Sequence, residues 1–125
     1  MNWTAIGAAL MALAVGMGAF GAHGLRDRLD AYSMTVYEKA VFYHFVHALG
    51  ILLVALLART SGITPARQAR VAWPLLIGII VFSGSLYALA VTGVRMLGAI
   101  TPIGGLAFII GWLVLVYEAL RVQRT

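Results

Sequence analysis

The stretch that decides the fold is VFYHFVHALGILLVALLA, residues 41–58. It contains no Asp, Glu, Lys or Arg. An α-helix rises about 1.5 Å per residue, so a run of this length spans roughly 27 Å, close to the hydrocarbon thickness of a bilayer. Backbone groups in hydrocarbon must be satisfied within the segment, which favours a helix over an isolated strand. The stretch therefore predicts a transmembrane helix.

Three further runs have the same character, at 3–22, 73–93 and 102–120. The chain of 125 residues is 62% hydrophobic and only 10% charged, and its mean hydropathy is +0.97. A soluble domain of this size has too high a surface-to-volume ratio to bury so many apolar side chains. We therefore expect a single all-α domain over residues 1–125, an integral membrane four-helix bundle.

The longest polar stretch is 26–40, and apolar residues recur at helical spacing from just before it, which predicts a short amphipathic interfacial segment between helices 1 and 2. They are Leu25, Leu29, Tyr32 and Val36. Thr35 followed by Glu38 has the form of a capping box, so the second helix is expected to start near Thr35.

Two prolines indicate the remaining boundaries. Pro74 would kink any helix begun at Pro65, so a surface turn is expected before Trp73. Thr101 followed by Pro102 has the form of an N-cap and a first helical position, so the last helix is expected to start there.

Basic residues indicate the orientation, because four spans put both termini and the middle connector on one side. That side carries Arg59, Arg67, Arg70, Arg121 and Arg124, and the other carries Arg26, Arg28, Lys39 and Arg95. Cytoplasmic segments are enriched in Lys and Arg, so the excess on the first side favours cytoplasmic termini. We expect a multi-pass protein of the bacterial inner (plasma) membrane with both termini in the cytoplasm.

The end of the first run, GMGAFG at 16–21, matches the dinucleotide-binding fingerprint G-x-G-x-x-G. That loop must follow a strand and open a helix, whereas here it closes an apolar helix, so we reject a nucleotide site. The same region loosely resembles a signal-peptide cleavage site. No basic segment precedes the run, so we expect it to stay as a membrane anchor.

Small residues repeat every four positions along the first run and let helix backbones approach closely in lipid. The predicted helix-packing residues are Ala8, Ala12, Gly16, Gly18, Gly84, Gly104 and Gly105. The first helix has two such faces and should touch two neighbours. We therefore expect it at the centre of the bundle or at a subunit interface of a homo-oligomer.

Polar residues gather in one half of the spans, and burying them in a membrane is costly, so each is a candidate functional position. The candidate ligand-binding residues are His23, Tyr43, His44, His47, Ser83, Tyr87 and Thr101. Lys39, Tyr43 and His47 form a stripe with one helical turn between members, and His44 lies on the adjacent face. These positions could converge on a small polar pocket in the outer leaflet.

Several functions are compatible with such a pocket. It could hold a lipid or a small amphiphile. The three histidines, with Glu38, could instead ligate a divalent metal or hold a quinone. The same side chains could also serve only as hydrogen bonds between helices, in a structural or accessory protein that packs against itself or a larger membrane complex. The spacing favours packing, since it matches no diagnostic metal motif.

Other classes of function are poorly supported. The absence of cysteine excludes disulfides, thiolate metal sites and cysteine nucleophiles. Ser83-Gly84-Ser85 is not a nucleophile elbow, and Glu118 lies at the opposite end of the bundle, so neither enzymatic activity nor a cofactor is expected. The net charge of +5 comes from arginines scattered between apolar runs. Membrane lipids, and not nucleic acid, are therefore the expected partners.

Five motifs stand in order along the chain. They are GAFGAHGL at 18–25, YH with HALG at 43–50, FSGSLY at 82–87, ITPIGG at 100–105 and GW at 111–112. Together they resemble the YgdD-like family of small bacterial inner-membrane proteins, which has eukaryotic transmembrane relatives. The resemblance covers nearly the whole chain. It implies a four-helix membrane protein of unknown function and assigns no catalytic residues.

Overall fold

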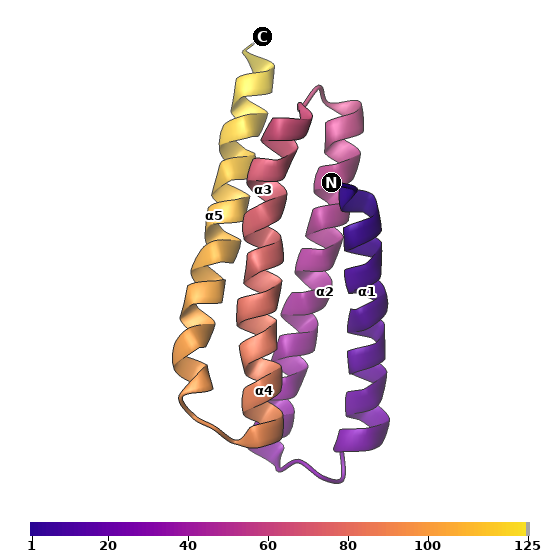
Figure 1. Ribbon diagram of the computed structural model, residues 1–125, viewed down its shortest axis with the longest axis vertical. Coiled ribbons are helices and arrows are strands. Elements are labelled where there is room, and N and C mark those ends of the chain that lie inside the picture. The colour runs from indigo at the N-terminus through magenta and orange to yellow at the C-terminus, as the bar shows by residue number, and fades with distance from the viewer. Residues whose placement is uncertain (125) are drawn as a thin grey trace.

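The computed structural model describes residues 1–124, and every regular element within them is a helix (Figure 1). The elements are α1 (Trp3–Phe20), the π-helical segment η1 (Gly21–Leu25), α2 (Ala31–Thr60), α3 (Pro65–Gly78), the π-helical segment η2 (Ile79–Ser83), α4 (Gly84–Thr92) and α5 (Leu97–Gln123). They form four spans, α1–η1, α2, α3–η2–α4 and α5, each long and apolar enough to cross a membrane. The expected all-α membrane fold is confirmed.

The spans lie side by side in chain order, from α1 at one edge to α5 at the other (Figure 1). α1 packs mainly on α2, and its first residue reaches α3, where the rings of Trp3 and Trp73 meet edge to face with centroids 5.4 Å apart. The third span packs against both α2 and α5. Of the two positions expected for the first helix, the central one is therefore wrong, because α1 lies at the edge (Figure 1). A position at a subunit interface stays a prediction.

The molecule has two ends of different make-up (Figure 1). The connectors 26–30 and 93–96 form one end, which we call the loop end. Both termini and the connector 61–64 form the other, which we call the termini end. This arrangement follows directly from four consecutive spans.

The core lies where α2, α3 and α5 meet. Ile51, Val54, Val71 and Leu75 are fully buried there, and Phe108 of α5 packs against them. The outer faces carry many exposed large apolar side chains. A surface of this kind is suited to hydrocarbon and would promote aggregation in water.

α2 begins earlier than the sequence predicts. Asp30 is the N-cap, and its carboxylate accepts a hydrogen bond from the Ser33 N–H at 2.7 Å. Hydrogen bonds from the backbone and the side chain of Ser33 hold the pKa of the Asp30 carboxyl below its usual range. The Thr35 hydroxyl instead donates to the Ala31 carbonyl at 2.9 Å. The predicted start near Thr35 was wrong, and the amphipathic residues 31–36 form the first turns of α2 in place of a separate segment.

The two boundaries inferred from prolines were also wrong. α3 begins at Pro65, capped by Thr64, and continues through Pro74. α5 begins at Leu97, so Thr101 and Pro102 lie inside it and Thr101 is no cap. A proline removes one backbone hydrogen bond, which membrane helices tolerate because neighbouring groups satisfy the freed carbonyl.

Some of the predicted helix-packing residues lie against a neighbouring helix, and the others do not. Gly104 of α5 lies against the backbone of η2: a Cβ there would come within 2.7 Å of the Phe82 Cα, so only glycine permits this approach. Gly18 and Gly105 face side chains of neighbouring helices at ordinary distances. The members that are exposed or face open space are Ala8, Ala12, Gly16 and Gly84.

Candidate functional site

The candidate polar residues do not meet in one pocket. They divide among the interior of the helix layer, a groove on one face and the exposed surface. His44, Ser83 and Tyr87 lie between helices, Tyr43, His47 and Thr101 line the groove, and His23 of η1 is exposed.

The interior group ties α2 to the spans on both sides. His44 is 1% exposed, and its Nδ1 lies 2.8 Å from the Tyr87 hydroxyl of α4. The Ser83 hydroxyl of η2 donates to the Ala40 carbonyl of α2 at 2.9 Å, and Tyr37 of α2 donates to a carbonyl of α1, that of Met17. Such bonds between helices stabilise association in a membrane. The arrangement is that of a packing network.

His44 retains one unused polar atom. Its Nε2 is buried and forms no hydrogen bond with any residue of the described chain. The backbone of Leu10 in α1 lies near the ring without reaching hydrogen-bond geometry. If Tyr87 donates to Nδ1, the proton of a neutral His44 lies on Nε2 and faces α1.

Both nitrogens of His47 are engaged. Nδ1 lies 2.8 Å from the Tyr43 carbonyl, which can only accept, so the ring proton is on Nδ1. Nε2 then accepts a hydrogen bond from the Trp112 indole N–H at 3.1 Å. The ring also stacks on Phe108, with centroids 3.5 Å apart and planes 11° from parallel. His47 is thus a neutral imidazole that packs between α2 and α5. Because its Nε2 lone pair already accepts from Trp112, the ring has no lone pair to offer a metal.

A groove runs between α2 and α5 from the loop end toward the middle of the spans. Three adjoining hollows form it, with volumes of about 400, 530 and 590 Å³. Tyr32, Leu89 and Gly98 line both the first and the second, and Tyr43, Phe82 and Pro102 line both the second and the third. Because the hollows share walls, we treat them as one site, the α2–α5 groove.

The chemistry of the α2–α5 groove changes along its length. At the loop end it is lined by two cations, Lys39 and Arg95, and by hydroxyl-bearing residues that include Tyr32 and Thr35. Further in, the walls are aromatic and apolar, formed by residues that include Phe108 and Trp112. No carboxylate is found among the described residues that line the three hollows. The groove is therefore polar and cationic at one end and apolar at the other.

Thr101 lines the groove with its hydroxyl already bonded. Its Oγ1 lies 2.7 Å from the Ser85 hydroxyl of α4 and 3.3 Å from the Leu97 carbonyl. These contacts hold α5 to α4 beside the groove. Thr101 thus shapes the wall and offers an occupant little unused hydrogen-bonding capacity.

A smaller hollow of about 220 Å³ lies on the other side of α2, against the end of α1 and η1. Arg26 and Glu38 both line it, so a cation and a carboxylate face the same space. Glu38 therefore does not join His47, which lines the groove. Within residues 1–124 no group of three or more His, Cys, Asp or Glu side chains could hold a metal ion.

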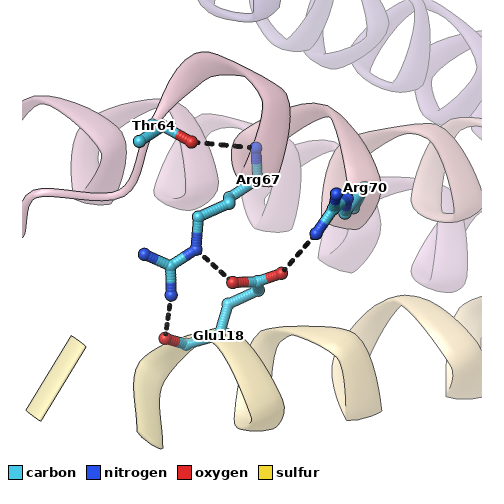
Figure 2. Close-up of polar contacts among 4 residues, drawn as sticks. All are labelled: Thr64, Arg67, Arg70 and Glu118. Atoms are coloured by element: carbon cyan, nitrogen blue, oxygen red, sulfur yellow. Dashed lines mark hydrogen bonds and ion pairs between the residues drawn. The ribbon is translucent and has the colours of Figure 1, made fainter. Parts of the chain in front are cut away.

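The ion pairs found among residues 1–124 lie at the termini end, at a residue that the sequence interpretation set aside. Glu118 of α5 is 1% exposed, and Arg67 of α3 donates through Nε to its carboxylate and through Nη2 to its backbone carbonyl, the latter at 2.9 Å (Figure 2). Arg70 adds a second cation, with Nη1 3.5 Å from Oε1 (Figure 2). The available signal was a lone carboxylate in an apolar run, which requires a paired cation.

Comparison with known proteins identifies relatives over most of the chain. A family described as "Protein of unknown function (DUF423)" matches residues 17–105. A "UPF0382 membrane protein" of Staphylococcus epidermidis is 53% identical over 116 residues, covering 93% of both chains. The "UPF0382 membrane protein YwdK" of Bacillus subtilis is 49% identical over 117 residues, covering 93% of this chain and 94% of the relative.

No solved structure gives a significant match. The relatives are named membrane proteins, and the four spans described above agree with that name. The motifs resembled a family of small membrane proteins of unknown function, and that broader expectation is confirmed. The chain is an integral membrane protein that belongs to the DUF423 family, and its relatives in Staphylococcus epidermidis and Bacillus subtilis are UPF0382 membrane proteins.

Proposed function

We propose that this protein binds a membrane lipid or a lipid-like amphiphile in the α2–α5 groove. The polar headgroup lies at the loop end, near Lys39 and Arg95, and the hydrocarbon chain lies along the aromatic walls further in. This site replaces the single pocket expected from the sequence. It keeps Tyr43 and His47 as lining residues and leaves His44 and Tyr87 to helix packing.

The observation that carries the proposal is the gradient along the groove. Lys39, Tyr43 and His47 follow one face of α2 and line it in that order from the loop end. Eight residues of helix rise roughly 12 Å, close to the thickness of one hydrocarbon leaflet, about 15 Å. A molecule with a charged head and an apolar tail matches both the polarity and the depth of this face.

The test is retention of lipid by a protein whose groove has been filled. Gly105 lines the deepest hollow, and a Cβ there would have only ordinary contacts with the Phe82 ring, 3.7 Å away. Gly105→Trp should therefore place an indole in the groove without disturbing the helix contact at Gly104. The matched control is Ile103→Trp, at a position on the same helix that is 63% exposed.

Native mass spectrometry of the full chain in mild detergent measures the bound lipid. We expect wild type and Ile103→Trp to retain lipid adducts and Gly105→Trp to lose most of them, with thermal unfolding showing that all three are folded. Equal retention by folded Gly105→Trp and wild type would refute the proposal.

The orientation and the membrane are part of the same proposal. An excess of Lys and Arg at the termini end supports cytoplasmic termini in the bacterial inner membrane, with the groove opening in the outer leaflet. The YgdD-like relationship also stays a proposal, resting on the five sequence motifs. A C-terminal reporter that is active only outside the cytoplasm would contradict the orientation.

A structural or accessory role is the second candidate. The observation that favours it is the edge position of α1, where Ala8, Ala12 and Gly16 leave a small-residue face exposed. The natural chain has no cysteine, so Ala12→Cys is a clean probe of contact with a second copy. Disulfide-linked dimers from Ala12→Cys but not from the exposed Leu13→Cys would support self-association through this face. Equal yields from the two variants would count against it.

A further inference from the structure

The loop end carries four cations, and they differ in what faces them. Arg26 shares its hollow with the carboxylate of Glu38. Lys39 and Arg95 line the α2–α5 groove, whose described lining contains no carboxylate. Across residues 1–124, the ion pairs found are those of Arg67 and Arg70 with Glu118. The charge of the groove mouth is therefore not neutralised within the chain.

The two groove cations open onto a common space. Arg95 lines the outermost hollow and Lys39 the next, and Tyr32, Leu89 and Gly98 form walls of both. Lys39 comes from α2 and Arg95 from the connector before α5, so the pair flanks the groove from two different elements. An anion lying at the mouth would meet positive charge from both sides.

The apolar walls beyond the mouth restrict the chemical class of that anion. The mouth continues into walls that are aromatic and apolar, so an anion seated there would be attached to a hydrocarbon chain. Phosphate oxygens accept charge-assisted hydrogen bonds from Lys and Arg. The headgroup of a zwitterionic lipid would also bring an ammonium group, for which the groove offers no carboxylate.

We infer that the α2–α5 groove selects an anionic phospholipid, with its phosphate held between Lys39 and Arg95 at the loop end. This inference rests on the proposed lipid-binding function and adds the class of headgroup. Tyr32 supplies a further hydroxyl donor at the same mouth. Lys39 and Arg95 determine the selectivity, and the apolar walls determine whether lipid binds at all.

The size of the selectivity follows from the two charges. An interfacial Lys or Arg favours an anionic over a neutral headgroup by about five-fold, so two together give about thirty-fold. Added salt should reduce this preference, because the mouth is exposed to solvent and its charges are screened.

The experiment titrates the full chain in mild detergent with phosphatidylglycerol or with phosphatidylethanolamine of identical acyl chains, and counts bound lipids by native mass spectrometry. Wild type should prefer phosphatidylglycerol by about thirty-fold. Lys39→Gln/Arg95→Gln should bind both lipids alike. The control is Arg28→Gln, an exposed cation of the same end that lines none of the hollows described here, and it should keep the wild-type preference.

The variant Gly105→Trp separates the two proposals. Wild type that binds both lipids equally, with both lost in Gly105→Trp, would overturn the headgroup inference and leave lipid binding intact. A preference that survives in Lys39→Gln/Arg95→Gln would likewise overturn the assignment to these two residues. Absence of binding by wild type, or binding unaffected by Gly105→Trp, would overturn both proposals.

Discussion

Two cations at each end of the molecule differ in whether a carboxylate faces them. At the termini end, Arg67 donates to both the carboxylate and the backbone carbonyl of Glu118, and Arg70 lies nearby (Figure 2). At the loop end, Lys39 and Arg95 border a groove with no carboxylate among its described lining residues. Arg67 and Arg70 are therefore paired with a carboxylate inside the chain, whereas the two groove cations share their described lining with no carboxylate.

This difference distinguishes cations that join two helices from cations that stay exposed beside a groove. A buried carboxylate with its arginine joins α3 to α5, and removing one partner leaves a charge in an unfavourable place. An exposed cation at the membrane surface costs little to keep and remains available to an anionic headgroup. Variants at the two ends should accordingly differ in whether they change stability or lipid selectivity.

The largest effect is expected at Glu118. Glu118→Gln leaves Arg67, which is 17% exposed, without its counter-ion, and we expect a loss of about 3 kcal/mol in the free energy of unfolding. Unfolding in mixed micelles measures this value. Replacing both partners, as Arg67→Met/Glu118→Met, should recover much of the loss.

The control for this prediction is Arg124→Gln, an exposed cation at the same end, which should unfold like wild type. If Glu118→Gln were as stable as wild type, the ion pair would not stabilise the packing of α3 on α5. The proposed difference between the cations of the two ends would then be wrong.

The next effect concerns the close approach of α5 to η2 beside the groove. Gly104→Ala would drive a methyl group into the Phe82 backbone, and we expect a loss of about 2 kcal/mol in the free energy of unfolding. Gly16→Ala is the control, because a Cβ there meets nothing within 4 Å. Equal stability of the two variants in the same unfolding assay would show that this wall of the groove is not closely packed.

A smaller effect is expected from the interior network. Tyr87→Phe removes the hydroxyl that bonds to His44 Nδ1, which should lower the free energy of unfolding by about 1 kcal/mol. Tyr117→Phe, at a position that is 58% exposed, controls for loss of a hydroxyl as such. Lipid retention should be unchanged in Tyr87→Phe, since this residue lines none of the three groove hollows. Loss of lipid from a folded Tyr87→Phe protein would indicate that lipid binds at the interior group, near His44 and Tyr87, and not in the groove.

The smallest change in stability is expected where the selectivity changes most. Lys39→Gln/Arg95→Gln alters two exposed side chains that form no ion pair within residues 1–124, so the free energy of unfolding in lipid-free detergent should stay within about 0.5 kcal/mol of wild type. A loss comparable to that of Glu118→Gln would mean that these cations are structural after all.

Hydropathy and length were sufficient to predict the four spans, whereas the capping and proline patterns failed at the helix ends. The Thr35–Glu38 pattern does not cap the second helix, because Asp30 caps it earlier in the chain. Pro74 and Pro102 were treated as boundaries, although both lie within helices. Several residues near a helix end can each cap or interrupt the helix, and tertiary contacts decide which of them marks the boundary.

The site was predictable in part for a similar reason. Helical periodicity places Lys39, Tyr43 and His47 on one face, and all three line the groove. Periodicity does not reveal which neighbour each face meets, so it could not separate His44, bonded to Tyr87, from His47, bonded to Trp112. The partner of Glu118 was missed because Arg67 is 51 residues away in the chain.

The central claim is that lipid occupies the α2–α5 groove, and the most direct test maps where a lipid tail lies. Phosphatidylglycerol with a photoactivatable acyl chain would be cross-linked to the full chain at low lipid-to-protein ratio, and the modified residues identified by mass spectrometry. Adducts should concentrate on Tyr43, Phe82, Phe108 and Trp112. Adducts spread evenly over exposed apolar residues such as Leu53 and Leu113, with none enriched in the groove, would contradict the account.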